Sequence, residues 1–366
     1  MFGAQEHMSK VRIKDIAEIA NVSVGTVDRV IHKRGEVSAG TRQRIEQLLE
    51  QFNYKPHIAA RSLALKREIH LAIMMPEVVN DHSFWEMPRQ GIRQAVESLG
   101  HEQLVLHHFY FDQSDRRGFS AMVEDFPFDR VEGLLFAPVF REESVAFLER
   151  CALEKIPVIL FNSYLAASSV KGFVGQDAYG SGCVAARLMA YGLQEGGDVA
   201  IINMSARKNN YAHIVERERG FRSYFAKLGN HRGRLIGADL NGAHGRQLGK
   251  KLEELFSASE IAGLFVTNSR VHEVAARLEE SGRKGIRLVG YDLLHENVRY
   301  LEKDLIDFLI SQRPDEQAFR GLNTLFNLVV FNHEAHAGQW LPIDIITREN
   351  LPYYKPKKYM NGTSGI

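Results

Sequence analysis

Arg29 has the clearest chemistry for reading the edge of a base pair, because a guanidinium can bind O6 and N7 of guanine together. Its neighbours offer less: Val24 can make only a methyl contact with thymine, and Gly25 has no side chain. Asp28 either accepts a hydrogen bond from N4 of cytosine or pairs with Arg29, and both interpretations stay open. This group therefore predicts contact with the bases of DNA.

Such residues need a helix that turns its N-terminal end toward a DNA groove, and the surrounding sequence predicts one. Apolar residues recur at helical spacing over 13–20, residues 21–23 interrupt the pattern, and the spacing resumes over 24–31. Ser23 is a good N-cap for the second helix. Two helices joined by a tight turn make a helix-turn-helix, although a small three-helix bundle without a DNA role is the alternative. The residues expected at the groove are Ser23, Val24, Gly25, Thr26, Asp28 and Arg29.

An ordered series of residues strengthens this prediction. It comprises Ile13, Asp15-Ile16-Ala17, Ala20, Val22-Ser23, Thr26-Val27, Arg29-Val30-Ile31, Val37-Ser38, Thr41-Arg42, Ile45, Asn53-Tyr54-Lys55-Pro56 and Ala60-Arg61-Ser62-Leu63. With these residues, the stretch 11–64 resembles the headpiece of the lactose-repressor (LacI/GalR) family of bacterial transcription regulators. Two positions depart from the family pattern: Asp28 replaces its usual serine and His32 its usual asparagine.

Residues 56–65 could form a short helix that is not stable by itself and needs DNA or a partner chain in order to fold. In the family that the stretch resembles, this hinge helix pairs with its twin in a dimer and inserts a leucine into the minor groove. Leu63 occupies that position. Without the resemblance, Leu63 would be interpreted as ordinary packing.

Charge and length favour a chain of two parts. Residues 1–68 contain twelve Lys or Arg and eight Asp or Glu, a net charge of +4, while the remainder carries −3. Positive charge is thus concentrated where phosphate would be met. A chain of 366 residues exceeds most single cores, so we expect a headpiece at 1–55, a hinge and linker at 56–68, a large domain at 69–350 and a tail at 351–366.

The sequence indicates a cytoplasmic protein. No apolar run approaches transmembrane length, and the first ten residues lack the apolar core of a signal peptide. The only cysteines, Cys151 and Cys183, are too few for a disulfide framework, so we expect reduced thiols.

From residue 69 onward, apolar strands alternate with amphipathic helices, which is typical of parallel β-α-β construction. The expected strands are 69–75, 103–108, 133–137, 158–161, 172–174, 198–204, 233–238, 263–267, 287–291 and 308–310. The expected helices include 87–99, 145–154, 178–192, 216–228, 242–256 and 272–282. The fold class is therefore a small all-α headpiece plus an α/β domain of two doubly wound parallel-sheet lobes, which resembles the family's effector domain and the related periplasmic sugar-binding proteins.

Polar and aromatic residues follow several of these strands, where ligands of such sheets bind. Phe84 and Trp85 could cover the apolar face of a sugar ring, with core packing as the alternative for Trp85. By resemblance to the family, Arg217 in an R-x-x-G-F segment is expected to face the ligand. Asn can donate and accept hydrogen bonds, and Asp can accept from two adjacent hydroxyls. The other expected effector residues are Asn162, Asp177, Asn268, Asp292 and Gln312.

One departure affects the identity of the effector. The family's usual Asn-Asp pair is Asn268-Ser269 in this chain, and Arg270 follows. The expected ligand is consequently left as a sugar, a cyclitol or a related acid.

Catalytic interpretations are less well supported. Residues 180–185 match GxGxxA but lie in mid-chain, without the acidic residue that dinucleotide binding requires, so helix packing is favoured. His333 and His336 are spaced by three residues, not the four of a zincin helix, and lack a third ligand. The sequence therefore predicts no catalytic residues, no cofactor and no metal site.

We expect a homodimer, with higher oligomers open, that binds a roughly palindromic operator and responds to a small molecule between the two lobes. By default we expect repression that the ligand relieves, although corepression by the ligand would use the same parts. The alternative is a carbohydrate-binding or sugar-processing protein whose headpiece serves another purpose.

Overall fold

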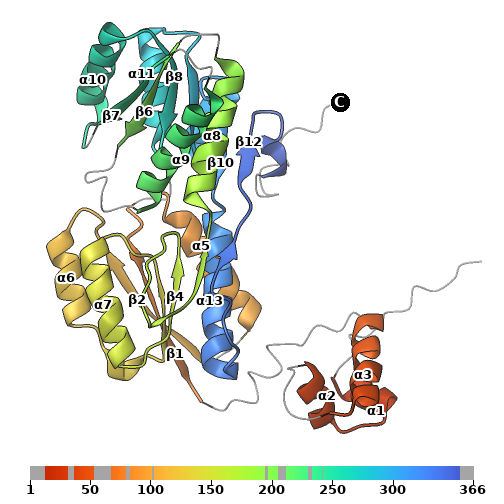
Figure 1. The fold of residues 1–366 in the computed structure, drawn as a ribbon. Helices are drawn as coiled ribbons and strands as arrows, with labels where there is room; N and C mark the ends of the chain where they lie inside the picture. The colour runs from red at the N-terminus through yellow and green to blue at the C-terminus, as the bar shows by residue number, and fades with distance from the viewer. Residues whose placement is uncertain are drawn as a thin grey trace, which may run out of the picture. The chain divides into compact units, whose positions relative to one another are not determined.

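The chain divides into two compact units, Met1–Lys66 and Arg67–Ile366 (Figure 1). The structure is a computed structural model, and it describes residues 13–31, 37–52, 67–79, 83–100, 103–193, 197–204, 212–229, 233–240 and 242–354. The expected hinge helix and Leu63 lie outside these residues.

In the first unit, the helix-turn-helix that the sequence predicts is confirmed. Its helices are α1 (Ile13–Ala20), α2 (Val24–Ile31) and α3 (Ala39–Gln51). Asn21 begins the turn between α1 and α2 with a φ of 53°, a left-handed conformation that asparagine tolerates better than most residues. One apolar core joins the three helices and consists of Ile16, Ala17, Ala20, Val27, Val30 and Ile45.

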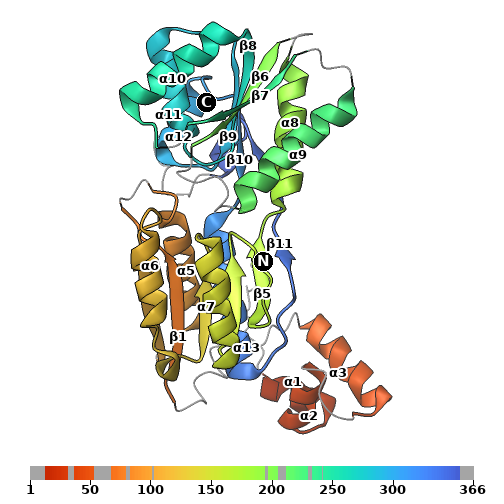
Figure 2. The same ribbon diagram turned by 60° about the vertical axis from the view of Figure 1, so that its left-hand side comes forward.

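The second unit contains two sheets, each at the centre of one lobe (Figure 2). The strands of lobe 1 run in the order β11-β5-β4-β3-β1-β2, and every neighbouring pair is parallel. Their bounds are β1 (Ile69–Pro76), β2 (Leu104–Phe111), β3 (Gly133–Phe136), β4 (Val158–Phe161), β5 (Val170–Gly175) and β11 (Gln339–Trp340). β1, β3 and β4 are short apolar runs that are almost completely buried, as expected for a parallel sheet covered on both faces.

Helices cover both faces of this sheet. α13 (Pro314–Phe331) packs against α5 (Glu86–Leu99) and against strands β3, β4 and β5. Figure 1 shows α6 (Arg116–Glu124) and α7 (Arg141–Leu153) on the opposite side. A short 3-10 helix, Phe128–Arg130, precedes β3.

Lobe 2 repeats this construction in the order β12-β10-β9-β8-β6-β7, in which only β12 is antiparallel to its neighbour. The strand bounds are β6 (Asp198–Asn203), β7 (Leu235–Asp239), β8 (Ile261–Val266), β9 (Arg287–Tyr291), β10 (Phe308–Ser311) and β12 (Asp344–Ile346). The 3-10 helix Leu351–Tyr353 follows the last strand.

Two apolar clusters lie on the two faces of this second sheet. Alternate strand residues such as Val199 and Ile201 face α8 (Ala178–Gly192) and α9 (Ala212–Leu228). The intervening residues, such as Ala200 and Ile202, face the other cluster. That cluster is completed by α10 (Gly245–Ala258), α11 (Val271–Ser281) and α12 (His295–Glu302). Each lobe is therefore a doubly wound layer with its own core.

All ten strands expected from the sequence are present, with ends shifted by a few residues. The chain also contains α6, α12, α13, β11 and β12, which were not among the elements named from the sequence. None of the helices in the described part of the chain is long and apolar enough to cross a membrane.

Candidate functional sites

The first candidate site is the N-terminal end of α2. The Oγ of Ser23 accepts a hydrogen bond from the backbone N–H of Thr26 at 3.1 Å, so Ser23 caps the helix as predicted. Val24 is 38% exposed although it is apolar, and Gly25 and Arg29 are exposed too. Val27 and Val30 turn into the core instead. The end of the helix consequently presents Ser23, Val24, Gly25 and Arg29 to solvent, while Thr26 is partly exposed.

Two of the expected DNA contacts, Asp28 and Leu63, have side chains outside the described part of the structure. The backbone of Asp28 lies within α2, whereas the whole of Leu63 is outside the described residues. Their roles remain predictions.

The second candidate site is a cavity of about 620 Å³ in the second unit, lined by residues of both lobes. Many of these residues follow directly on the carboxyl ends of strands, for example Asn162 after β4, Asn268 after β8 and Gln312 after β10. This is where doubly wound sheets bind ligands, because backbone groups are free at that edge. The volume falls in the range of about 300–1,000 Å³ that is usual for small-molecule sites.

Lobe 1 contributes an aromatic and apolar wall. The Phe84 and Trp85 rings lie edge to face with centroids 5.0 Å apart, and both line the cavity. Trp85 is only 6% exposed, and its ring also packs edge-on against Phe161. Its indole N–H points toward the Oε1 of Gln113, at 3.5 Å. Trp85 therefore both belongs to the core and forms part of the cavity wall, with less free ring surface than the sequence suggested.

Arg217 of α9 is the most deeply buried cation of the site, at 2% exposure. Its guanidinium donates to the backbone oxygen of Thr267 at 2.8 Å and to the Oε1 of Gln312. One face lies 3.7 Å from the centroid of the Tyr291 ring, a cation-π contact that is strong where water is absent. Burial lowers the pKa of Arg217, while Tyr291 and Asp292 oppose that shift.

Gln312 joins Arg217 to Asp292. Its Nε2 donates to the Oδ2 of Asp292 at 2.7 Å, and its backbone N–H donates to Oδ1 at 3.3 Å. Burial raises the pKa of Asp292 to about 6, although Arg217 and Gln312 favour the charged form. Asp292 is completely buried and is not among the residues that line the cavity. The carboxylate thus accepts two hydrogen bonds that orient Gln312, and it does not itself line the cavity.

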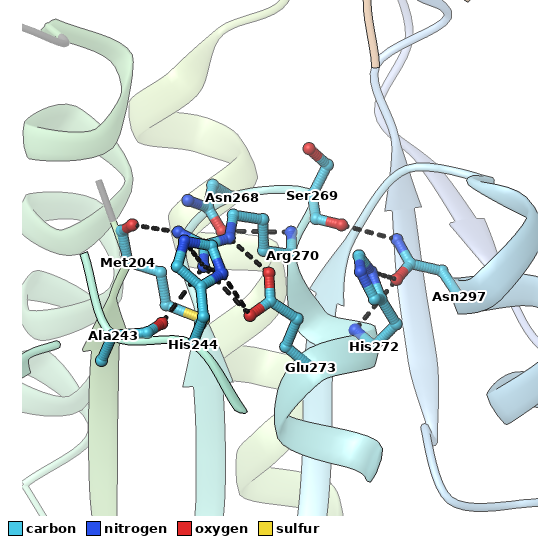
Figure 3. A network of polar contacts seen from close by, with 9 residues as sticks. All are labelled: Met204, Ala243, His244, Asn268, Ser269, Arg270, His272, Glu273 and Asn297. Carbon is cyan, nitrogen blue, oxygen red and sulfur yellow. Dashed lines mark hydrogen bonds and ion pairs between the residues drawn. The ribbon is translucent and has the colours of Figure 1, made fainter. Parts of the chain in front are cut away.

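Asn268 faces the cavity with its amide orientation set by a neighbour (Figure 3). The backbone N–H of Arg270 donates to the Oδ1 of Asn268 at 3.2 Å. This contact fixes which end of the amide is the oxygen, and the amide N–H groups can donate to a ligand.

Arg270 itself holds three segments of lobe 2 together. Its guanidinium donates to the backbone oxygens of Met204 and Ala243, at 2.6 and 3.3 Å, and forms a two-pronged ion pair with Glu273 (Figure 3). His244 contacts both charged groups. The charge of Arg270 is therefore neutralised within the cavity wall.

Asp177 is placed away from the cavity. It is the N-cap of α8, and its Oδ1 accepts the backbone N–H of Gly180 at 2.9 Å. It is not among the cavity-lining residues. Phe84, Trp85, Asn162, Arg217, Asn268 and Gln312 are brought together around the cavity, whereas Asp177 and Asp292 are not.

Several imidazoles line the cavity that the sequence interpretation missed. His213 of α9 contacts the Oγ of Ser163 in lobe 1 at 2.9 Å, and burial lowers the pKa of His213 to about 3, so the ring is neutral. His272 contacts the Oδ1 of Asn297 through Nδ1 at 2.9 Å. The Nδ2 of Asn297 donates to three backbone oxygens, so Oδ1 is the acceptor and Nδ1 of His272 carries the proton. No local motif marks these histidines, because only the fold brings them to the cavity.

The GxGxxA match at 180–185 packs one helix on another, as the sequence analysis favoured. A Cβ on Gly182 would lie 2.0 Å from the backbone oxygen of Arg217, and one on Gly220 would lie 2.0 Å from that of Tyr179. These glycines allow α8 and α9 to approach closely, and they fix the backbone that carries Arg217.

Two family models match the chain. Residues 71–333 match the model described as periplasmic binding protein domain, and residues 12–57 match that for bacterial regulatory proteins of the lacI family. The HTH-type transcriptional regulator DegA of Bacillus subtilis (strain 168) is 29% identical over 154 residues, which cover 42% of this chain and 44% of DegA. The ribose operon repressor of Lactococcus lactis subsp. lactis (strain IL1403) is 20% identical over 290 residues, covering 76% of this chain and 80% of the repressor.

Solved structures share the fold. The structure of a protein described as a putative LacI transcriptional regulator from Bacteroides fragilis aligns with a TM-score of 0.74 at 24% identity, over 79% of this chain and all of that chain. A solute binding protein from Bacillus halodurans C-125, solved with bound myo-inositol, aligns with a TM-score of 0.68 at 16% identity, covering 79% of this chain and 97% of its own. The matches therefore include relatives with the DNA-binding part and transport proteins with the two-lobed part.

Proposed function

Because this chain belongs to the LacI family of bacterial regulatory proteins, we propose that it is a ligand-responsive DNA-binding transcription regulator. It acts as a repressor, and a small molecule in the cavity between the lobes changes its affinity for operator DNA. The observation that carries this function is the presence, in one chain, of a capped helix with an exposed N-terminal end and a separate ligand-sized cavity.

At the DNA, Arg29 is the principal base reader, with Ser23, Val24, Gly25, Thr26 and Asp28 around it. Its exposed position on α2 supports this role, because a bidentate guanidinium contact with guanine discriminates by about 1–3 kcal/mol. The chain acts as a homodimer on a palindromic operator in the cytoplasm, and Leu63 is the minor-groove wedge.

In the cavity, the ligand is a sugar, a cyclitol or a related acid. Phe84 and Trp85 provide the wall for the apolar face of a ring, while Arg217, Asn268 and Asn162 provide hydrogen bonds to its oxygens. Relatives named as ribose and sucrose operon repressors, and solute binding proteins solved with tagatopyranose or arabinose, support this class. Asp292 stabilises the Gln312 side chain.

The test compares the full chain with a truncated chain that lacks residues 1–66. DNA selected from a random pool by the full chain should bind only the full chain. A thermal-shift screen over pentoses, hexoses, sugar phosphates, uronates and cyclitols should stabilise both chains equally, because stabilisation follows the occupied cavity.

Protection of the same DNA by the truncated chain would refute the DNA-binding assignment. Failure of the full chain to select any DNA, together with stabilisation by a sugar, would instead favour a carbohydrate-binding or sugar-processing protein.

A further inference from the structure

The chain passes between the two lobes at three places. Residues 176–177 lead from β5 to α8, residues 312–313 lead from β10 to α13, and residues 341–343 lead from β11 to β12 (Figure 2). Any change in the angle between the lobes must be absorbed in these three crossovers. Contacts that join them consequently decide how freely the lobes move.

One side chain joins all three crossovers. Gln176 lies in the first, and its Nε2 donates to the backbone oxygen of Ser311 at 3.0 Å and to that of Pro342 at 2.8 Å. Ser311 ends the strand that enters the second crossover, and Pro342 lies in the third. Gln176 is 7% exposed, so both N–H groups of its amide are engaged away from bulk water.

A second contact joins the second and third crossovers. The guanidinium of Arg313 binds both carboxylate oxygens of Asp344, and it also donates to Glu316 at 2.9 Å. These hydrogen bonds raise the pKa of Arg313. Arg313 has a φ of 51°, a left-handed conformation that costs energy in a residue other than glycine and that surrounding contacts must stabilise.

The second crossover also contains Gln312, which lines the cavity. Its side chain bonds to Arg217 and Asp292 in lobe 2, as described above. Its backbone oxygen accepts from the Nε2 of Gln317 on α13 at 2.8 Å, and the Oε1 of Gln317 accepts from the backbone N–H of Asn162 at 2.9 Å. Gln312 therefore connects cavity residues of both lobes through a series of buried and partly buried hydrogen bonds.

From this arrangement we propose that Gln312 transmits ligand contact to the lobe hinge and that Gln176 clasps the three crossovers so that they move as one unit. Both are positioning residues, and the inference rests on the proposed function. A ligand that shifts Arg217 or Asn162 must either break the hydrogen bonds of Gln312 or move the second crossover. Breaking buried hydrogen bonds is costly, so the crossover moves, and Gln176 carries the first and third crossovers with it.

Gln176→Met tests the clasp, because methionine has a similar length and removes both donors. Nitroxide labels at Leu153→Cys on α7 and Tyr191→Cys on α8 report the distance between lobes, since these positions are 80% and 78% exposed. Cys183→Ala removes the half-buried thiol, while Cys151 is buried and its thiol pKa is raised to about 12, which disfavours labelling there. In the full chain with Gln176 intact, we expect one narrow distance distribution, and Gln176→Met should broaden it.

Gln339→Met is the matched control, because the Nε2 of Gln339 donates to Thr324 within lobe 1 and joins no crossovers. It should leave the distribution narrow. If Gln176→Met does not fold, Asp344→Asn weakens the Arg313 contact and is expected to broaden the distribution in the same way. A folded Gln176→Met or Asp344→Asn whose distribution coincides with that of the control would overturn the inference.

The functional arm uses the screened compound that gives the largest thermal shift with the unmodified chain. In Gln176→Met, that compound should still shift the melting temperature, but its fold-effect on operator binding should fall toward one. A fold-effect equal to that of the unmodified chain contradicts the clasp. If the unmodified chain itself shows no response, the proposed function fails, and the distance measurement still judges the clasp.

Discussion

Burial disfavours the ionised carboxylate of Asp292. It is fully buried and has a φ of 66°, and burial raises its pKa to about 6 from an ordinary value near 3.8. The two hydrogen bonds from Gln312 favour the ionised carboxylate but do not offset the loss of hydration. At neutral pH this charge therefore opposes folding while it orients Gln312.

Asp292→Asn should make the free energy of unfolding less dependent on pH. Between the unfolded and folded pKa values the native carboxyl holds a proton that the unfolded chain has lost, so its contribution to stability falls as pH rises through about 6. The shift of about two pH units corresponds to about 3 kcal/mol. Asparagine does not titrate, so the variant does not lose this stability as the pH rises. The free energy of unfolding of Asp292→Asn, minus that of the original chain, should therefore increase by up to that amount from pH 4 to pH 7.

Urea unfolding followed by tryptophan fluorescence at a series of pH values measures this difference. A difference that stays constant from pH 4 to pH 7 would show that Asp292 does not titrate in that range.

Sequence patterns found residues that follow strands but not what each side chain contacts. Asn162, Asn268 and Gln312 follow strands and line the cavity. Asp177 also follows a strand, yet its carboxylate caps α8 because a helix begins immediately after it. That competing use was visible in the sequence, whereas the approach of His213 to Ser163 depends on two segments 50 residues apart.

At the scale of elements, the α8–α9 contact sets the position of Arg217. The helices meet at Gly182 and Gly220, where backbone oxygens occupy the space that a Cβ would need. Helix α9 thus holds its arginine at a depth that larger residues at the contact would not permit.

Gly182→Ala should push α9 away from α8 and displace Arg217. Its Cβ would lie 2.0 Å from the Arg217 oxygen, which is backbone and cannot turn aside. Overpacking of this kind costs about 1–3 kcal/mol. We expect a lower melting temperature and loss of the ligand-induced thermal shift.

Gly249→Ala on α10 is the control, since its Cβ would make an ordinary contact 3.5 Å from the Cδ of Arg277. Alanine favours a helix over glycine, so this variant should be at least as stable and should respond to ligand normally. An unchanged ligand response in Gly182→Ala would show that the helix contact does not position Arg217.

A local pattern predicted most of the elements, although the helices α6, α12 and α13 were not named from the sequence. Short apolar runs bounded by polar turns identified all ten long strands of the sheets. β11 has two residues and β12 has three, which is too short for any periodicity. β11 pairs with β5, more than 160 residues earlier, so its place depends on a long-range contact that its own sequence does not reveal.

For the whole molecule, the proposed DNA site and the ligand cavity lie in different units of the chain. Coupling between them must therefore be a difference in free energy between states of the whole chain, because all the described residues that line the cavity belong to the second unit. Such coupling is typically about 1–3 kcal/mol, a five- to hundred-fold effect on binding.

Coupling of this kind is reciprocal, which gives a quantitative test. The factor by which ligand changes the operator Kd must equal the factor by which saturating operator changes the ligand Kd. Calorimetric titration of the selected compound with and without operator, and anisotropy titration of the operator with and without the compound, measure the two factors independently. In the chain that lacks residues 1–66, operator should leave the ligand Kd unchanged, because the proposed DNA contacts are gone. Equal factors near one in the full chain would mean that ligand occupies the cavity without reaching the DNA-binding unit.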